Sequence, residues 1–199
     1  NKTFANLNGT RILKLNHNKI SFFEIEVFNY LKDLIELELS FNFLDRIDSS
    51  IFRPLEKLED LNLNNNKIIQ IESKAFENLI RLKKLLLSSN KIMDLDQNIF
   101  KNLHNLEQLE LKNNQISKMN FLSFNSLIKL KHLNLENNCL FMLKKKLFDS
   151  NKELRYLSIA NNVIKKIKYY NFRNLIHLNL LNMSYNNIRE IENGSFEDL

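Results

Sequence analysis

Hydrophobic and polar positions alternate in a short segment that returns every 24 residues along the chain. In "LEDLNLNNNKI", from Leu58 to Ile68, leucines alternate with polar residues until three asparagines interrupt the pattern. When positions are numbered 1 to 24 in each copy, positions 4, 6, 11 and 14 are always apolar, position 9 is always Asn and position 19 is always Phe. This regularity predicts a repeat protein with one partial copy at residues 1–9. The full copies begin, without insertion or deletion between them, at residues 10, 34, 58, 82, 106, 130, 154 and 178.

The period of two around positions 4 and 6 predicts one short strand in each copy, with one face buried. A single strand cannot bury its own apolar face, so the copies must stack and form a parallel sheet. The rest of each copy returns along the far side and brings the phenylalanine of position 19 into the core. A sheet on one side and a looser return on the other predict a curved solenoid.

The three adjacent asparagines of the third copy have different predicted roles. Asn66, at position 9, lies between two core positions, so its amide should be buried and hydrogen-bonded to backbone groups of its own turn and of the neighbouring copy. Asn65 stands at the bend and should form the turn. Asn64, at position 7, should point from the strand onto the outer face of the sheet, free to contact a ligand.

Composition supports asparagine as the turn residue. The 199-residue chain has only 2 Gly and 1 Pro but 33 Asn. Asparagine tolerates left-handed backbone and bonds its own backbone, so it can replace glycine in turns. No segment approaches the apolar run of a membrane helix.

Nothing in the sequence indicates catalysis, a cofactor or a metal site. The four histidines fall at unrelated repeat positions, and no nucleophile elbow, phosphate-binding glycine loop or metal-ligand spacing is present. The single cysteine, Cys139, excludes an internal disulfide framework and a cysteine-rich zinc site. Without a histidine placed to activate it, Cys139 is expected to be a free, partly exposed thiol.

The repeated residues form the signature L-x-x-L-x-L-x-x-N-x-L, in which the chain resembles the leucine-rich repeat family. The 24-residue length and the F-x-x-L tail, as in "AFENL" from Ala75, resemble the typical subfamily of extracellular proteins. That subfamily includes Toll and Toll-like receptors, Slit, chaoptin-like adhesion proteins, small proteoglycans and arthropod leucine-rich immune proteins. The resemblance implies an α/β solenoid, a horseshoe with a parallel sheet on the concave face and mostly irregular or 3-10 return segments on the convex face. It covers residues 1–199 as one domain.

The resemblance also implies a function. We expect a non-enzymatic ligand-binding ectodomain, secreted or at the cell surface, that recognises a protein or glycan in receptor signalling, innate immunity or cell adhesion. One alternative is an extracellular-matrix or scaffold protein that uses its repeats for structural assembly. A third, less supported interpretation is an enzyme-inhibitor module. The chain starts and stops inside repeats without cysteine-rich caps, so we expect a fragment of a longer ectodomain, with any membrane attachment in a flanking segment. Uncapped ends would favour end-to-end association, such as a homodimer.

Positions 3, 5 and 7 carry no framework residue and should line the concave face, the usual ligand surface of such solenoids. Two interpretations stay open: charges that satisfy one another across the strands, or a polar surface for a protein ligand or co-receptor. The acidic patch that forms the first local hypothesis consists of Glu36, Glu38, Glu59 and Asp60. The full set of candidate ligand-binding residues is Glu36, Glu38, Asp60, Asn62, Lys84, Glu110, Lys112, His132 and Tyr156.

Charge is uneven along the chain. Residues 34–81 contain 6 basic and 9 acidic side chains, whereas residues 130–177 contain 10 basic and 3 acidic ones. Lysines that should form one patch off the sheet are Lys144, Lys145, Lys146, Lys165, Lys166 and Lys168. They either solubilise the chain or bind an anionic partner such as a sulfated glycan. Nucleic acid is disfavoured because it also requires stacking aromatics, for which only the adjacent Tyr169 and Tyr170 are present.

Four N-glycosylation sequons occur, at Asn1, Asn8, Asn182 and Asn193. Composition alone gives about three in a chain so rich in asparagine, so the count does not indicate secretion. Asn8 and Asn193 are expected to be exposed and are the glycosylation candidates. Asn182 falls at position 5, where a glycan would block the concave face.

Overall fold

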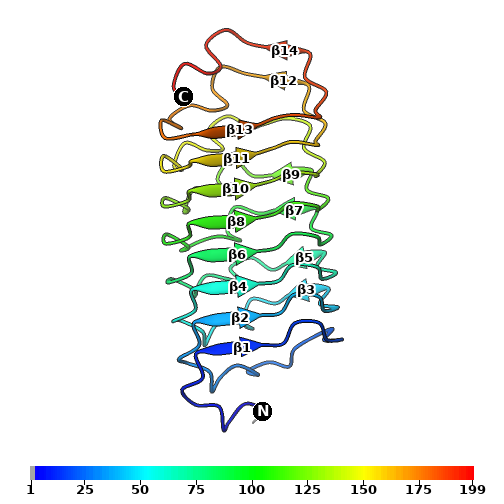
Figure 1. Ribbon diagram of the computed structural model, residues 1–199, viewed down its shortest axis with the longest axis vertical. Coiled ribbons are helices and arrows are strands. Elements are labelled where there is room, and N and C mark those ends of the chain that lie inside the picture. Colours follow the sequence, from blue (N-terminus) through cyan, green and yellow to red (C-terminus); the bar gives the residue numbers. More distant parts are fainter. Residues whose placement is uncertain (1–2) are drawn as a thin grey trace.

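The computed structural model describes residues 3–199 and shows a solenoid in which each turn adds one strand to a parallel sheet (Figure 1). Successive copies pair in register, so Leu37 lies between Leu13 and Leu61. The eight strands, in spatial order, are β1 (Ile12–Lys14), β2 (Glu36–Glu38), β4 (Asp60–Asn62), β6 (Lys84–Leu86), β8 (Gln108–Glu110), β10 (His132–Asn134), β11 (Tyr156–Ser158) and β13 (Leu180–Asn182). The predicted parallel sheet is confirmed.

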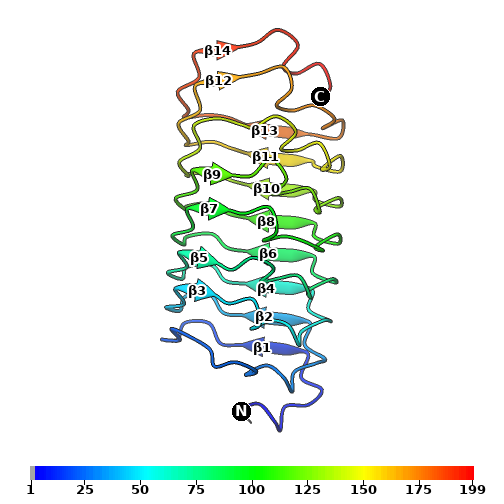
Figure 2. The same cartoon turned by 180° about the vertical axis from the view of Figure 1, so that it is seen from behind.

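The return segments are built from turns and very short strands (Figure 2). These strands pair two by two: β3 (Arg46–Ile47) with β5 (Gln70–Ile71), β7 (Asp94–Leu95) with β9 (Lys118–Met119), and β12 (Lys166–Ile167) with β14 (Glu190–Ile191). Within residues 3–199 the chain forms no α- or 3-10 helix, so the irregular return is confirmed but its helical content is not. The apolar residues of position 14 stack in register, which lets neighbouring backbones pair there instead. The described part of the chain therefore has no helix that could span a membrane.

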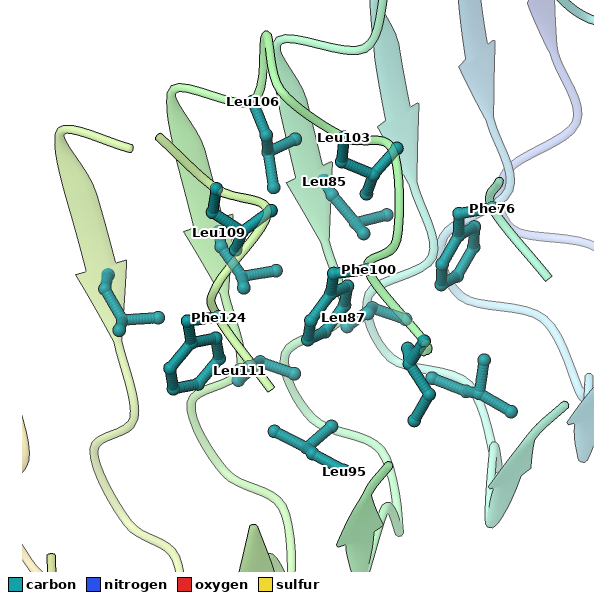
Figure 3. Close-up of a cluster of buried hydrophobic side chains, with 14 of the residues drawn as sticks. Phe76, Leu85, Leu87, Leu95, Phe100, Leu103, Leu106, Leu109, Leu111 and Phe124 are labelled. Atoms are coloured by element: carbon teal, nitrogen blue, oxygen red, sulfur yellow. The ribbon is translucent and has the colours of Figure 1, made fainter. Parts of the chain in front are cut away.

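The core lies between the sheet and the return segments. Figure 3 shows Phe76, Phe100 and Phe124 in a row, beside leucines that point inward from the strands. Ring centroids of successive position-19 phenylalanines are 5.9 to 6.5 Å apart, with stacking contacts from Phe4 to Phe148 and again between Phe172 and Phe196. Each fully buried ring contributes about 1.5–3 kcal/mol of hydrophobic stabilisation.

The spacing of the phenylalanines indicates the direction in which the solenoid bends. Hydrogen-bonded parallel strands lie about 4.8 Å apart. One copy thus advances less at the sheet than at the phenylalanines, whose centroids are about 6 Å apart. A stack of such wedges bends with its sheet on the inner side, which makes the sheet face the concave one.

The buried, hydrogen-bonded amide predicted for Asn66 is confirmed, and the asparagines of position 9 form a ladder along the solenoid. The Nδ2 of Asn66 donates to the carbonyl oxygens of Leu63 (3.1 Å), Asn64 (3.3 Å) and Leu39 of the preceding copy (3.0 Å). Its Oδ1 accepts the backbone N–H of Leu44 in the preceding copy at 3.1 Å. The amide thus serves backbone groups that the turn would otherwise leave unpaired. Equivalent asparagines buried to the same degree, between 2% and 8% exposed, are Asn42, Asn90, Asn114, Asn138 and Asn162.

The residue before each ladder asparagine has left-handed backbone. Asn65 has a φ of 54°, which confirms it as the turn residue. The same conformation occurs at this position in all eight copies, at His17, Phe41, Asn65, Ser89, Asn113, Asn137, Asn161 and Tyr185. Half of these are asparagine, the non-glycine residue that adopts this conformation most readily. The others show that the ladder imposes the turn whatever the residue.

Candidate ligand-binding face

The surface formed by positions 3, 5 and 7 of the main sheet is called the sheet face below. All nine candidate residues lie on it, on or directly after six neighbouring strands from β2 to β11. In-register pairing places Asp60 between Glu36 and Lys84. The side chains are partly exposed, as expected for strands with one buried and one solvent face. The structure thus brings the candidates together in one row across the repeats.

The sheet face has a hollow of about 200 Å³ over β2, β4 and β6. The residues that line this hollow, called the acidic hollow below, are Glu36, Leu37, Glu38, Asp60, Leu61, Asn62, Lys84 and Leu86. Five of them are candidates from the sequence. Leu86 was not a candidate, although an apolar residue where other copies carry polar ones was a usable signal.

Asp60 is the least compensated carboxylate of the acidic hollow. Burial raises the pKa of its carboxyl above the ordinary value, and the nearby carboxylates of Glu36 and Glu59 raise it further against the opposing effect of Lys84. Among residues 3–199 the Asp60 carboxylate accepts no hydrogen bond and forms no ion pair, although Lys84 is its register neighbour. A cationic group entering the hollow would relieve this carboxylate.

The other acidic groups near the hollow are already occupied. Glu38 accepts the backbone N–H of Ser40 (2.9 Å) and the Nδ2 of Asn62 (2.8 Å). Glu59, part of the predicted acidic patch, lies outside the hollow and pairs with the Nζ of Lys83 at 2.7 Å. Glu36 has a looser contact, 3.7 Å from the Nζ of Lys14. Asp60 is therefore the group left for a partner.

The candidates at the other end of the row satisfy one another. The Oε1 of Glu110 lies 2.7 Å from His132 Nε2 and accepts the Nε2 of Gln108 at 3.0 Å. Burial alone would raise the pKa of Glu110, but the hydrogen bonds from His132 and Gln108 outweigh it and leave the pKa below its usual value. The ring of His132 stacks on Tyr156, with centroids 4.1 Å apart and planes 3° from parallel.

Lys112, the remaining candidate, forms an ion pair with Glu136 at 3.0 Å. The first interpretation, charges that satisfy one another, holds for one part of the face, and the second, a ligand surface, stays a prediction for the other part. Charges satisfy one another over β8 to β11, and an unsatisfied carboxylate remains over β4.

The lysines off the sheet differ in their contacts. The Nζ atoms of Lys145 and Lys168 lie 5.7 and 5.6 Å from the ring centroid of Tyr170. Lys166 instead forms ion pairs with Glu190 (2.7 Å) and Glu192 (2.9 Å), and these hydrogen bonds raise its pKa to about 12. The charge of Lys166 is therefore balanced by acidic residues of the next copy. Lys166 does not belong with the other lysines of the predicted patch.

The sequence also predicted which sequon asparagines, which thiol and which amide are accessible. Asn8 and Asn193 are exposed, as expected, and so is the thiol of Cys139. Asn1, the first sequon, lies outside the described residues. Asn64 does not match its prediction fully, because its Oδ1 accepts the backbone N–H of Ser88 in the next copy at 2.6 Å.

Two protein-family models match the chain and support the predicted leucine-rich repeats. A model described as leucine rich repeat matches residues 32–92, and one described as BspA type leucine rich repeat region (6 copies) matches residues 70–199. A search of curated protein sequences gave no match.

Solved structures with the same fold include chains from three complexes. One is in the complex of TLR13 with ssRNA13 (33% identity, TM-score 0.85, 89% of this chain and 25% of that one). Another is in the Toll–Spatzle complex of Drosophila (22% identity, TM-score 0.75, 94% and 29%). The third is in an octameric complex of Latrophilin 3, Unc5D and FLRT2 (26% identity, TM-score 0.73, 98% and 66%). The chain thus spans between a quarter and two thirds of the length of these proteins.

Proposed function

Since the chain belongs to the leucine-rich repeat family, we propose that it is a non-enzymatic binding domain that recognises a protein ligand through its sheet face. The ligand contributes a cationic side chain to the acidic hollow. The domain acts outside the cell, in receptor signalling, innate immunity or cell adhesion. The single observation that carries the proposal is the unpaired, partly buried carboxylate of Asp60 inside a hollow of about 200 Å³.

The chemistry of the hollow supports a basic side chain as its occupant. Removing a carboxylate from water is unfavourable unless a cation or donor compensates it. An arginine or lysine of a ligand would pair with Asp60, while its methylene stem would pack against Leu86. Such a buried pair of charge and apolar stem is typical of the few residues that dominate protein interfaces.

RNA is the competing class of ligand, because the TLR13 structure contains single-stranded RNA. The charge of the sheet face here argues against it. The acidic hollow would repel phosphate groups, which basic side chains must neutralise for RNA to bind. We therefore place a protein, not RNA, on this face.

The test is a selection of phage-displayed peptides on the immobilised chain. We expect enriched peptides to carry arginine or lysine and to lose most of their binding to the Asp60→Asn variant. The matched control is Asp45→Asn, which makes the same charge change at an exposed residue off the sheet face. Peptides that bind both variants equally, or no enrichment at all, would overturn the proposal.

A further inference from the structure

The lysines on the return side of the sixth and seventh copies remain without a role in the proposed function. We propose that this surface is a second site, which binds a sulfated polysaccharide through Lys145, Lys168 and the lysines beside them. It lies off the sheet face, so it could be occupied together with a protein ligand.

The ring of Tyr170 forms cation–π contacts with the ammonium groups of Lys145 and Lys168, which lie near one another. The Nζ atoms of Lys145 and Lys168 are 5.7 and 5.6 Å from its ring centroid, so they lie within about 11 Å of each other. These lysines come from successive copies of the repeat, and only stacking of the copies brings them to one ring. Like charges repel, so their attraction to the aromatic ring offsets part of that repulsion and concentrates positive charge there.

The surrounding lysines lack anionic partners. Five of the six form no ion pair within residues 3–199, and these are Lys144, Lys145, Lys146, Lys165 and Lys168. Asp149 and Glu153 are the only acidic residues between positions 141 and 177. The nearest acid of the next copy is Glu192, whose pKa is lowered first by its hydrogen bond from Lys166, then by that from the backbone N–H of Tyr169 (3.1 Å), and least by the charge of Lys168. Its carboxylate is therefore already occupied. The surface therefore carries uncompensated positive charge that a polyanion would neutralise.

A sulfated polysaccharide fits this surface better than a nucleic acid does. Single-stranded nucleic acids bind through successive aromatic faces on which bases stack, together with basic groups. Here the ring of Tyr170 is already contacted by two lysines, and Tyr169, 55% exposed, meets it edge-on at 5.1 Å. The site thus offers clustered point charges with one exposed ring. Such a site recognises dense anionic groups without requiring bases.

The test measures binding of heparin, the probe for a sulfated polysaccharide, to the full chain at low and physiological salt. Neutralising both lysines in a Lys145→Gln/Lys168→Gln variant should weaken heparin binding by roughly 10- to 30-fold, at about fivefold per lysine near an anionic surface. Tyr170→Leu keeps every charge and should weaken binding by only about two- to fivefold. Both losses should shrink as salt screens the charges.

The matched control is Lys91→Gln/Lys101→Gln, which makes the same change in net charge at two exposed lysines elsewhere. Equal weakening in the control and the test variant would mean that net charge alone binds heparin, and would overturn the site. Stronger binding to single-stranded RNA than to heparin, lost in Tyr169→Ala, would overturn the ligand class. Neither result bears on Asp60, so the site can fail while the proposed function stands.

Discussion

Asn66 and Asn64 lie two residues apart on the same turn, yet they belong to two regions that follow different rules. Asn66 belongs to the interior ladder, where its amide bonds backbone groups of two copies and the same bonds recur in its neighbours. Asn64 belongs to the sheet face, where its Oδ1 accepts the backbone N–H of Ser88, a contact that no other copy repeats within residues 3–199. The interior is therefore periodic because backbone geometry repeats, whereas the face varies because its partners are side chains.

The same contrast appears within the sheet face. Asp60 and His132 occupy equivalent positions of different copies, both register-paired with neighbours on either side. The neighbours of His132 satisfy it, while those of Asp60 leave its carboxylate unpaired. Position in the repeat thus decides which way a side chain points, and the side chains of adjacent copies decide whether it is available to a ligand.

The largest effect should follow from breaking the interior. Phe100 is 1% exposed and stacks between Phe76 and Phe124, so Phe100→Ala should lower the free energy of unfolding by about 3–5 kcal/mol. Urea denaturation followed by circular dichroism measures the change. The control is Phe121→Ala, whose ring is 44% exposed and should cost less than about 1 kcal/mol. Equal losses in both variants would contradict a core built on the phenylalanine ladder.

A smaller effect separates the two asparagines. Asn66→Ala removes a donor and an acceptor from buried backbone groups and should cost about 1–3 kcal/mol. Asn64→Ala removes one partly buried hydrogen bond, from the backbone N–H of Ser88, and should lower the free energy of unfolding by about 0.5–1 kcal/mol. The same denaturation experiment decides. If Asn64→Ala were as destabilising as Asn66→Ala, the division between interior ladder and sheet face would not hold.

The smallest changes in the free energy of unfolding are expected for two carboxylates of the sheet face, Glu110 and Asp60, and they have opposite signs. The pKa of Glu110 is lowered, so its charge stabilises the folded state above the ordinary carboxyl pKa, and this stability is lost as pH falls through the lowered value. Glu110→Gln should therefore destabilise the protein at pH 7. The pKa of Asp60 is raised, so its contribution is favourable below the ordinary pKa and is lost as pH rises through the raised value. Asp60→Asn should therefore stabilise the protein at pH 7.

Both of these changes should stay below about 1 kcal/mol, because solvent still screens these partly buried charges. Thermal unfolding at pH 7 and again at pH 3, which lies below the ordinary pKa of Asp and Glu, measures them. Both differences should shrink at pH 3. A stabilising Glu110→Gln at pH 7 would show that its bonds to His132 and Gln108 do not compensate its burial.

Much of the fold could be predicted from the chain because its repeat has no insertion. Asn66 and Asn65 could be assigned from position alone, since every copy places the same backbone geometry there. The two-residue strands of the return segment could not be predicted. Their pairing depends on how closely the stacked copies approach at position 14, and one copy read by itself carries no such information.

The sequence predicted which residues lie on the sheet face, but it did not predict which of them are paired with a neighbour. Reading positions 3, 5 and 7 located Glu36, Asp60 and His132 correctly on the sheet face, yet it could not separate the paired groups from the unpaired one. Leu86 also lies on the sheet face, at position 5, and lines the acidic hollow, but it was not among the candidates. Lys166 was grouped with its sequence neighbours, whereas its partners Glu190 and Glu192 lie one copy further along.

The sequence by itself determined the register of this protein: which residues face the core, which form the turn and which face solvent. It could do so because strand alternation and backbone hydrogen bonding are local and repeat with the chain. Only the tertiary structure decided which surface groups meet, such as Lys145 and Lys168 at Tyr170, and which stay unpaired, such as Asp60. Those contacts join different copies, and side-chain length and burial set them rather than position in the repeat.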